Sequence, residues 1–152
     1  MANPFPFVAG SVLTAAELNG IGETTSFTPV FTNFTLGNGT AVGTYTRVQN
    51  LVKGYVEVVL GSTSSVTGTW RVDLPIATTI AYDLQYAGLV RYVDSGTQTY
   101  VGFCNLTSNT QLTFTLFSPS GSYLVSLFAS TSAPFTWTTG DSLYASFVYE
   151  VA

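Results

Sequence analysis

The sequence predicts an all-β fold, a jelly-roll-like β-sandwich of eight or nine antiparallel strands behind a short N-terminal segment. From Phe27 onward, apolar and polar residues alternate with a period of two, which is typical of strands that bury one face. Gly, Asn, Ser and Pro recur between these runs as turn residues, and no segment after Gly22 has helical periodicity. Eight or nine strands in about 125 residues suit a jelly roll, in which two sheets pack around one core. An immunoglobulin-like sandwich is the alternative, although the chain lacks the cysteine pair usual in that fold.

We expect two parts in the chain, residues 1–23 as an N-terminal anchor segment and residues 24–152 as the β-sandwich domain. Thr14 and Glu17 have the spacing of a capping box, which predicts a short helix over Thr14–Asn19. A helix of this length is not stable alone in water. It must therefore lie on a surface, either its own domain or a partner, and the sequence leaves both open. The apolar residues that would anchor it to a partner are Phe5, Phe7, Val8, Leu13 and Leu18.

The strands follow from the alternation and from the turns between the runs. Gly37-Asn38-Gly39 is a tight-turn signal, Pro75 ends a strand because it cannot donate to a ladder, and Ser95-Gly96 joins two further runs. The predicted strands cover residues 31–36, 40–48, 51–60, 68–74, 86–94, 97–106, 111–118, 123–129 and 142–151.

The same alternation predicts which residues face the core. In the strand over 51–60, for example, one face is all apolar while Lys53, Tyr55 and Glu57 lie on the other. Cys104, in the middle of a strand, is predicted to be a small buried core residue. The predicted inward residues include Val52, Val56, Val58, Leu60, Trp70, Val72, Leu74, Leu112, Phe114, Leu116, Leu143, Ala145, Phe147 and Tyr149.

The charge composition excludes several classes of protein. Only 8% of the residues are charged, the formal net charge is −4, and 46% of the residues are hydrophobic. A disordered chain needs low hydrophobicity and high net charge, and a nucleic-acid-binding protein needs a cationic surface. No apolar run approaches the ~20 residues that span a bilayer. We therefore expect an ordered domain that binds no nucleic acid and does not insert into a membrane.

The residue types also limit the chemistry. The chain has no histidine and one cysteine, so neither a Ser-His-Asp triad nor a cysteine-rich zinc site is possible within it. Two carboxylates alone can hydrolyse a glycoside, but the carboxylates here have structural explanations: Glu57 and Asp73 lie near Lys53 and Arg71, and Asp94 and Asp141 lie in turns. We therefore predict no enzymatic activity, no cofactor and no metal. The carboxylates considered are Glu57, Asp73, Asp83, Asp94, Asp141 and Glu150.

The segment from Ser95 to Gly140 contains no charged residue at all, yet it is rich in aromatic residues. Within it, the strand that begins at Tyr123 has apolar residues on both faces. A large exposed apolar surface usually marks an interface, so we expect a homo-oligomer, most simply a ring of copies. The interface candidates are Tyr123, Val125, Leu127, Phe128, Phe135 and Trp137. The alternative is that all of these residues enter one thick core.

Three stretches resemble bacteriophage virion proteins. Residues 7–19, FVAGSVLTAAELN, resemble the opening of tail-fibre and minor-tail proteins. Residues 45–58 followed by 68–75 are similar to the β head domains of such fibres and to small head-decoration proteins. Residues 135–150, FTWTTGDSLYASFVYE, are similar to the close of those heads. Fibre proteins usually have a long shaft after the opening segment, and here residues 21–28 join the two parts directly.

This resemblance implies a non-enzymatic structural protein of the virion, assembled in the host cytoplasm. The short connection favours a capsid decoration (cement) protein or a short tail component, attached to capsid or tail proteins by its N-terminal segment, with a homotrimer as the expected ring. The alternative is a receptor-binding head of a tail fibre or tail tip that recognises host surface glycans through its aromatic, Thr-rich surface.

Overall fold

The computed structural model describes residues 10, 12, 14, 15, 21–78, 85–120 and 123–151, apart from the side chains of residues 85, 119, 120 and 123. In these ranges the chain is all-β, as predicted, and every strand pairing is antiparallel. The strands are β1 (Thr24–Phe27), β2 (Phe31–Thr35), β3 (Thr40–Val48), β4 (Leu51–Val59), β5 (Ser65–Asp73), β6 (Gln85–Asp94), β7 (Gln98–Leu106), β8 (Gln111–Ser120), β9 (Tyr123–Phe128) and β10 (Ser142–Glu150).

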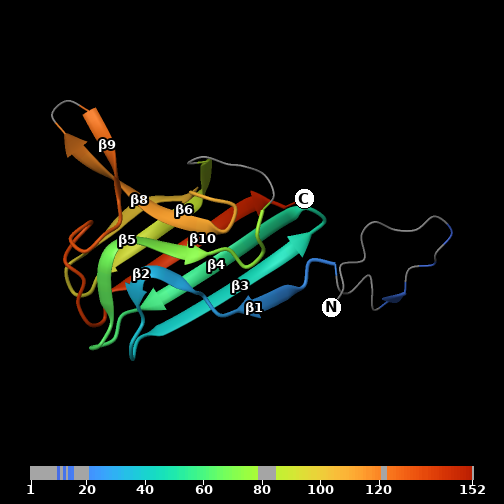
Figure 1. The fold of residues 1–152 in the computed structure, drawn as a ribbon, viewed down its shortest axis with the longest axis horizontal. Coiled ribbons are helices and arrows are strands. Elements are labelled where there is room, and N and C mark those ends of the chain that lie inside the picture. The colour runs from blue at the N-terminus through green and yellow to red at the C-terminus, as the bar shows by residue number, and fades with distance from the viewer. Residues whose placement is uncertain are drawn as a thin grey trace.

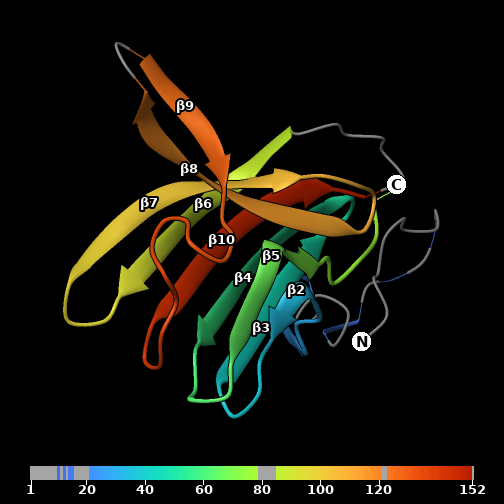
Figure 2. The same cartoon turned by 60° about the vertical axis from the view of Figure 1, so that its left-hand side comes forward.

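The strands form one continuous sheet that curls on itself. Its order is β1-β3-β4-β10-β6-β7-β8-β5-β2, and β9 pairs with β8 off this path. Because the sheet curls, β2 and β5 lie across the core from β4 and β10, which gives the two layers of a β-sandwich (Figures 1 and 2). The hydroxyl of Tyr149, on β10, donates to the carbonyl of Ile76 at 2.7 Å and so ties β10 to the segment that follows β5.

The strand order contains the layer crossings expected of a jelly-roll-like chain. The last strand, β10, lies between β4 and β6, although β5 separates these two in the sequence. β5 itself lies in the opposite layer, where it pairs with β2 and β8. The chain thus crosses between the layers before and after β2 and before and after β5, whereas β3–β4, β6–β7, β7–β8 and β8–β9 are paired neighbours. It closes by inserting its last strand beside β6, as in a Greek key.

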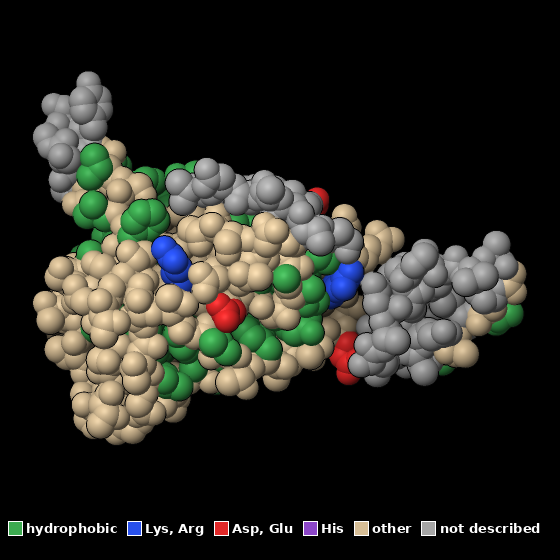
Figure 3. All heavy atoms as spheres, in the orientation of Figure 1, with side chains coloured by type: hydrophobic (Ala, Val, Ile, Leu, Met, Phe, Trp, Pro, Cys, Tyr) green, Lys and Arg blue, Asp and Glu red, His purple; other side chains and the backbone are tan. Residues whose placement is uncertain are grey.

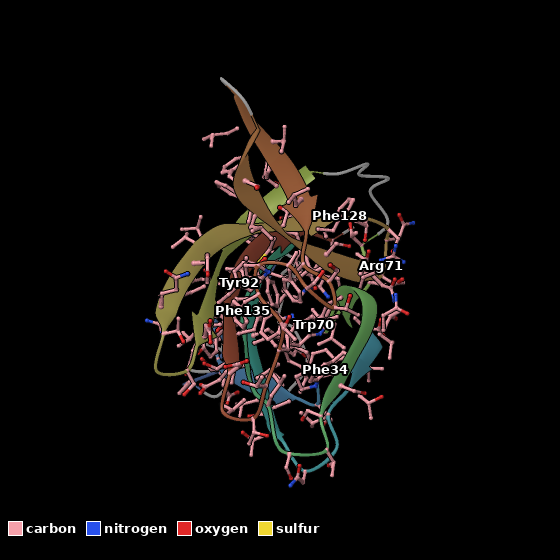
Figure 4. All side chains as sticks on the ribbon, turned by 90° about the vertical axis from the view of Figure 1, so that its left-hand side faces the viewer. Phe34, Trp70, Arg71, Tyr92, Phe128 and Phe135 are labelled. Atoms are coloured by element: carbon pink, nitrogen blue, oxygen red, sulfur yellow. The ribbon has the colours of Figure 1, made fainter. Side chains whose placement is uncertain are left out.

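The core lies between the two layers and is strongly aromatic. Trp70, from β5, is fully buried, stacks on Phe34 with ring centroids 4.3 Å apart, and meets Phe114 edge to face at 6.1 Å. Figure 4 shows Trp70, Phe34 and Tyr92 inside the fold. The inward residues of β4, β8 and β10 predicted from the alternation are buried as well. Cys104 is also confirmed as buried.

The loop between β9 and β10 closes one side of this core. Trp137, in the loop, lies 4.9 Å from Trp70 between ring centroids and donates its indole N–H to the carbonyl of Ser130 at 2.8 Å. Phe135 lies beside Trp137 at 4.6 Å and is only 9% exposed. Both residues were expected at an oligomer interface. The structure places them in or against the core, because the loop folds back onto Trp70.

The predicted strands agree with the structure except at a few boundaries. The alternation missed β1, because its sequence, TTSF, has one apolar residue and shows no period. β5 begins at Ser65, three residues before the predicted start at Gly68, and β8 continues to Ser120. The predicted helix over residues 14–19 lies outside the described residues, except for Thr14 and Ala15.

Candidate interaction surfaces

The carboxylates of the described residues form no group that could bind a metal ion. Asp73 accepts a hydrogen bond from the side-chain amide of Gln111 at 2.9 Å, and Glu57 accepts one from the Tyr55 hydroxyl at 3.2 Å. Asp141 is fully buried and holds backbone groups. Asp83 lies outside the described residues.

Cys104 is placed where it cannot act as a nucleophile. Its side chain is 0% exposed, its Sγ donates to the carbonyl of Leu89 at 3.4 Å, and burial raises the pKa of the thiol well above its usual range. The thiolate is the reactive form of cysteine. Cys104 is therefore a core residue.

The most prominent surface feature is a hairpin that stands away from the body of the sandwich. β8 pairs with β7 only as far as Leu116, which lies opposite Gly102. Beyond that point, residues 117–120 pair only with β9. Figures 1 and 2 show this ribbon projecting from one end of the fold. We call residues 117–120 together with residues 123–128 the arm.

The arm exposes apolar side chains on both of its faces. Residues that lie directly opposite each other in an antiparallel pair share a face, so Phe117, Leu124 and Phe128 lie on one face, and Val125 and Leu127 lie on the other. Leu124 is 68% exposed, and the others are 39% to 45% exposed. Hydrophobic side chains of the arm are visible at its end of the molecule in Figure 3. An isolated two-stranded ribbon is marginally stable in water, and this one has both faces uncovered.

A second apolar surface lies on the outer face of β6, β7 and β8 and continues into the arm. The ring of Phe103 contacts Tyr86 and Phe117 at centroid distances of 5.3 and 5.0 Å. Leu89 lies directly opposite Phe103 and is 55% exposed, and Val101 is 64% exposed. A register shift between Tyr86 and Gly88 turns Tyr86 to this outer face. We call Tyr86, Leu89, Val101, Phe103 and Phe117 the outer patch.

The predicted interface residues therefore divide into two groups. Val125, Leu127 and Phe128 lie exposed on the arm, as a role in association requires, whereas Phe135 and Trp137 pack with the core. Figure 4 shows Phe128 at the base of the arm and Phe135 inside the fold. The side chain of Tyr123 and the anchor residues Phe5, Phe7, Val8, Leu13 and Leu18 lie outside the described part of the structure.

The outer patch was not predicted from the sequence, although the sequence contains a signal for it. In a strand with period two, only one of two adjacent residues can face the core. Leu89-Val90, Tyr100-Val101 and Leu116-Phe117 are adjacent apolar pairs. One member of each pair is turned outward, and those members are Leu89, Val101 and Phe117.

A shallow groove of about 350 Å³ lies elsewhere, on the outer face of β1, β3, β4 and β10. Its lining combines threonine and serine hydroxyl groups with two tyrosines and a lysine. Burial and the neighbouring Glu57 carboxylate raise the pKa of Tyr55 to about 12, so its hydroxyl is protonated at neutral pH. The groove can thus donate and accept hydrogen bonds. It is lined by Thr24, Thr44, Tyr45, Thr46, Lys53, Gly54, Tyr55 and Ser146.

The described residues contain no helix long and apolar enough to cross a membrane. In comparisons with protein families, curated proteins and solved structures, nothing matched this chain.

Proposed function

We propose that this chain is a non-enzymatic structural subunit of a bacteriophage particle, in which the β-sandwich associates with copies of itself and attaches through residues 1–23. The observation that carries the self-association is the arm, whose two apolar faces are exposed in a single copy. Contiguous exposed apolar surface usually marks an interaction site. The virion setting rests on the resemblance of residues 7–19 and 135–150 to phage proteins.

The lack of charge around the arm supports association with a protein surface. All residues of the arm lie within the uncharged run from Ser95 to Gly140. The cores of protein interfaces are depleted in charged residues and enriched in aromatic ones. When a second apolar surface covers such a surface, no ion has to be removed from water, so burial carries no free-energy cost of desolvating charges.

Light scattering of the full chain at micromolar concentration tests the self-association. We expect a mass that is a multiple of 16.2 kDa. A monomer over the whole concentration range would contradict the proposal.

A chain lacking residues 1–22 tests the attachment. We expect this truncated chain to remain folded and associated while it no longer binds to phage particles that lack the protein. The full chain is the control. Equal binding of both chains would refute the anchoring role of residues 1–23.

A second function, recognition of a host surface glycan, is favoured by the groove. Its threonine and serine hydroxyls, the Tyr55 phenol and the Lys53 ammonium offer hydrogen bonds to sugar hydroxyl or carboxylate groups. Glycan-array binding tests this function. We expect Tyr55→Ala and Lys53→Ala to abolish any signal, while Leu51→Ala, an exposed position outside the groove, preserves it. No signal from the unchanged protein would remove this candidate.

A further inference from the structure

The molecule exposes two apolar surfaces, and they lie on opposite faces of its sheet. One is the outer patch, which continues onto the outer face of the arm at Phe117. The other is the inner face of the arm, with Val125 and Leu127, which continues the face of β8 that carries the core residue Leu116. On the body of the sandwich this face of β8 covers the core. On the arm, which projects beyond the body, the same face is exposed.

The symmetry of an assembly decides which of these surfaces can be covered. A two-fold contact uses the same patch on both copies, so a pairing of outer patch with outer patch leaves Val125 and Leu127 exposed. A pairing of arm with arm through those two residues leaves the outer patch exposed instead. A head-to-tail contact joins two different surfaces and covers both in every copy.

We propose that the inner face of one arm packs on the outer patch of the next copy, so that copies join head to tail in a closed ring. The inference rests on the self-association proposed above and specifies which two surfaces of the chain form the contact. The arm residues Val125 and Leu127 lie against Leu89, Val101 and Phe103 of the neighbouring copy.

Charge and size both favour this contact. Val101, Phe103, Val125 and Leu127 all belong to the uncharged run. Arg91 is exposed opposite Val101 on the same face, but its guanidinium lies 4.4 Å from the centroid of the Tyr144 ring, toward β10 and away from β7. Stable interfaces bury about 800 Å² on each partner, roughly 20 residues a side. The arm, residues 117–120 and 123–128, has only ten residues, so a contact between two arms is too small by itself. The head-to-tail contact adds the body of the neighbouring copy to the arm.

The unpaired edge of β9 is a further reason for the arm to be covered. Within the described residues β9 pairs only with β8, and an exposed apolar edge strand invites pairing with other chains. Packing of the arm on a neighbouring body limits the access of other chains to this edge.

Cysteine cross-linking tests the contact directly. Four double variants of the full chain combine Val125→Cys or Leu127→Cys on the arm with Leu89→Cys or Val101→Cys on the outer patch. They are treated under native conditions with a short bis-maleimide and separated under denaturing conditions. The unchanged protein is the control, because its own cysteine, Cys104, is buried. Light scattering of each reduced variant establishes that it still associates.

We expect at least one double variant to yield a covalent series of bands that ends at the size of the native ring, and each single variant to yield none. Cross-linking of the Leu127→Cys single variant to itself would show a contact between two arms and overturn the inference. So would the absence of cross-links in all four double variants while the protein remains associated. If the unchanged protein is a monomer, the proposed self-association fails together with this contact. If the protein associates but no double variant cross-links, only the head-to-tail contact fails. A series of bands with no upper limit would show a head-to-tail filament and refute closure into a ring.

Discussion

The carboxylate of Asp141 binds the backbone of Ser95: its Oδ1 accepts a hydrogen bond from the Ser95 N–H at 2.9 Å. Ser95 begins the uncharged run, and Asp141 is the first charged residue after it. The other oxygen, Oδ2, accepts from the backbone N–H of Thr138 at 2.5 Å and from its hydroxyl at 3.2 Å. This fully buried carboxylate therefore fixes the β9–β10 loop against the β6–β7 turn, and its role is structural.

We expect Asp141→Asn to lower the free energy of unfolding by about 1–3 kcal/mol, because the amide nitrogen cannot accept and leaves a buried donor without a partner. Urea denaturation measures the change. Glu150→Gln, an exposed position on the neighbouring β10 strand, is the matched control and should change stability by less than about 0.5 kcal/mol. Equal effects of the two substitutions would contradict the structural role of Asp141.

Gly102 allows β7 and β8 to approach closely at the base of the arm. A Cβ atom at this position would overlap the carbonyl oxygen of Thr115, so Gly102→Ala must force the two strands apart. We expect a loss of about 3 kcal/mol in thermal or urea unfolding, at the upper end of overpacking effects. Gly68→Ala is the control, since its Cβ would approach only the Asn33 side chain, at 3.2 Å. A Gly102→Ala protein as stable as Gly68→Ala would contradict the close approach of β7 and β8 at Gly102.

The buried tyrosines make stability depend on alkaline pH. Burial raises the pKa of Tyr92 above its ordinary value and raises the pKa of Tyr149 to about 12. Above pH 10 the unfolded chain loses these phenolic protons first, so the folded state binds more protons and stability falls as pH rises. Below pH 10 the contribution is fully present. From about pH 10 to 12 we expect a decline of about 1.4 kcal/mol per pH unit for each such phenol.

Tyr149→Phe separates this ionisation from other alkaline effects. It removes the hydrogen bonds of the Tyr149 hydroxyl with the backbone of Ile76, so the variant should be less stable at pH 7. Its further decline above pH 10 should be shallower than that of the unchanged protein. Urea midpoints measured from pH 8 to 12 give both quantities, and identical slopes would contradict the assignment.

The thiol of Cys104 should be inert in the folded protein. It is fully buried, and burial raises its pKa, so the reactive thiolate is not formed at neutral pH. We expect one equivalent of a chromogenic thiol reagent to react in denaturant and none to react within minutes under native conditions. Rapid labelling of the native protein would place Cys104 at the surface and contradict the packing of β7.

The strands could be predicted from the sequence because apolar and polar residues alternate along them, and burial follows this period of two most clearly in β4 and β10. The short β1 has no such pattern, and it forms because β3 supplies a partner for its backbone. The fates of Phe135 and Trp137 could not be predicted. They lie in a loop without periodicity, and only the tertiary position of Trp70 decides that this loop folds inward.

The interface residues show the same division. Apolar residues on both faces of residues 123–128 did indicate a strand with uncovered sides, and the exposure of Val125, Leu127 and Phe128 agrees with that interpretation. The outer patch depends on which member of an apolar pair faces out and on the register shift that turns Tyr86 outward. The alternation alone does not contain this information.

Sedimentation velocity of a charged arm variant tests the central claim, that the arm joins copies of the chain. Val125→Asp/Leu127→Asp places two carboxylates on the inner face of the arm, and Val148→Asp places one at an equally exposed position on the outer face of β10. We predict that the unchanged protein and Val148→Asp sediment as the same oligomer at micromolar concentration, whereas the double variant sediments as a folded monomer. Sedimentation of the double variant as the intact oligomer would contradict the account.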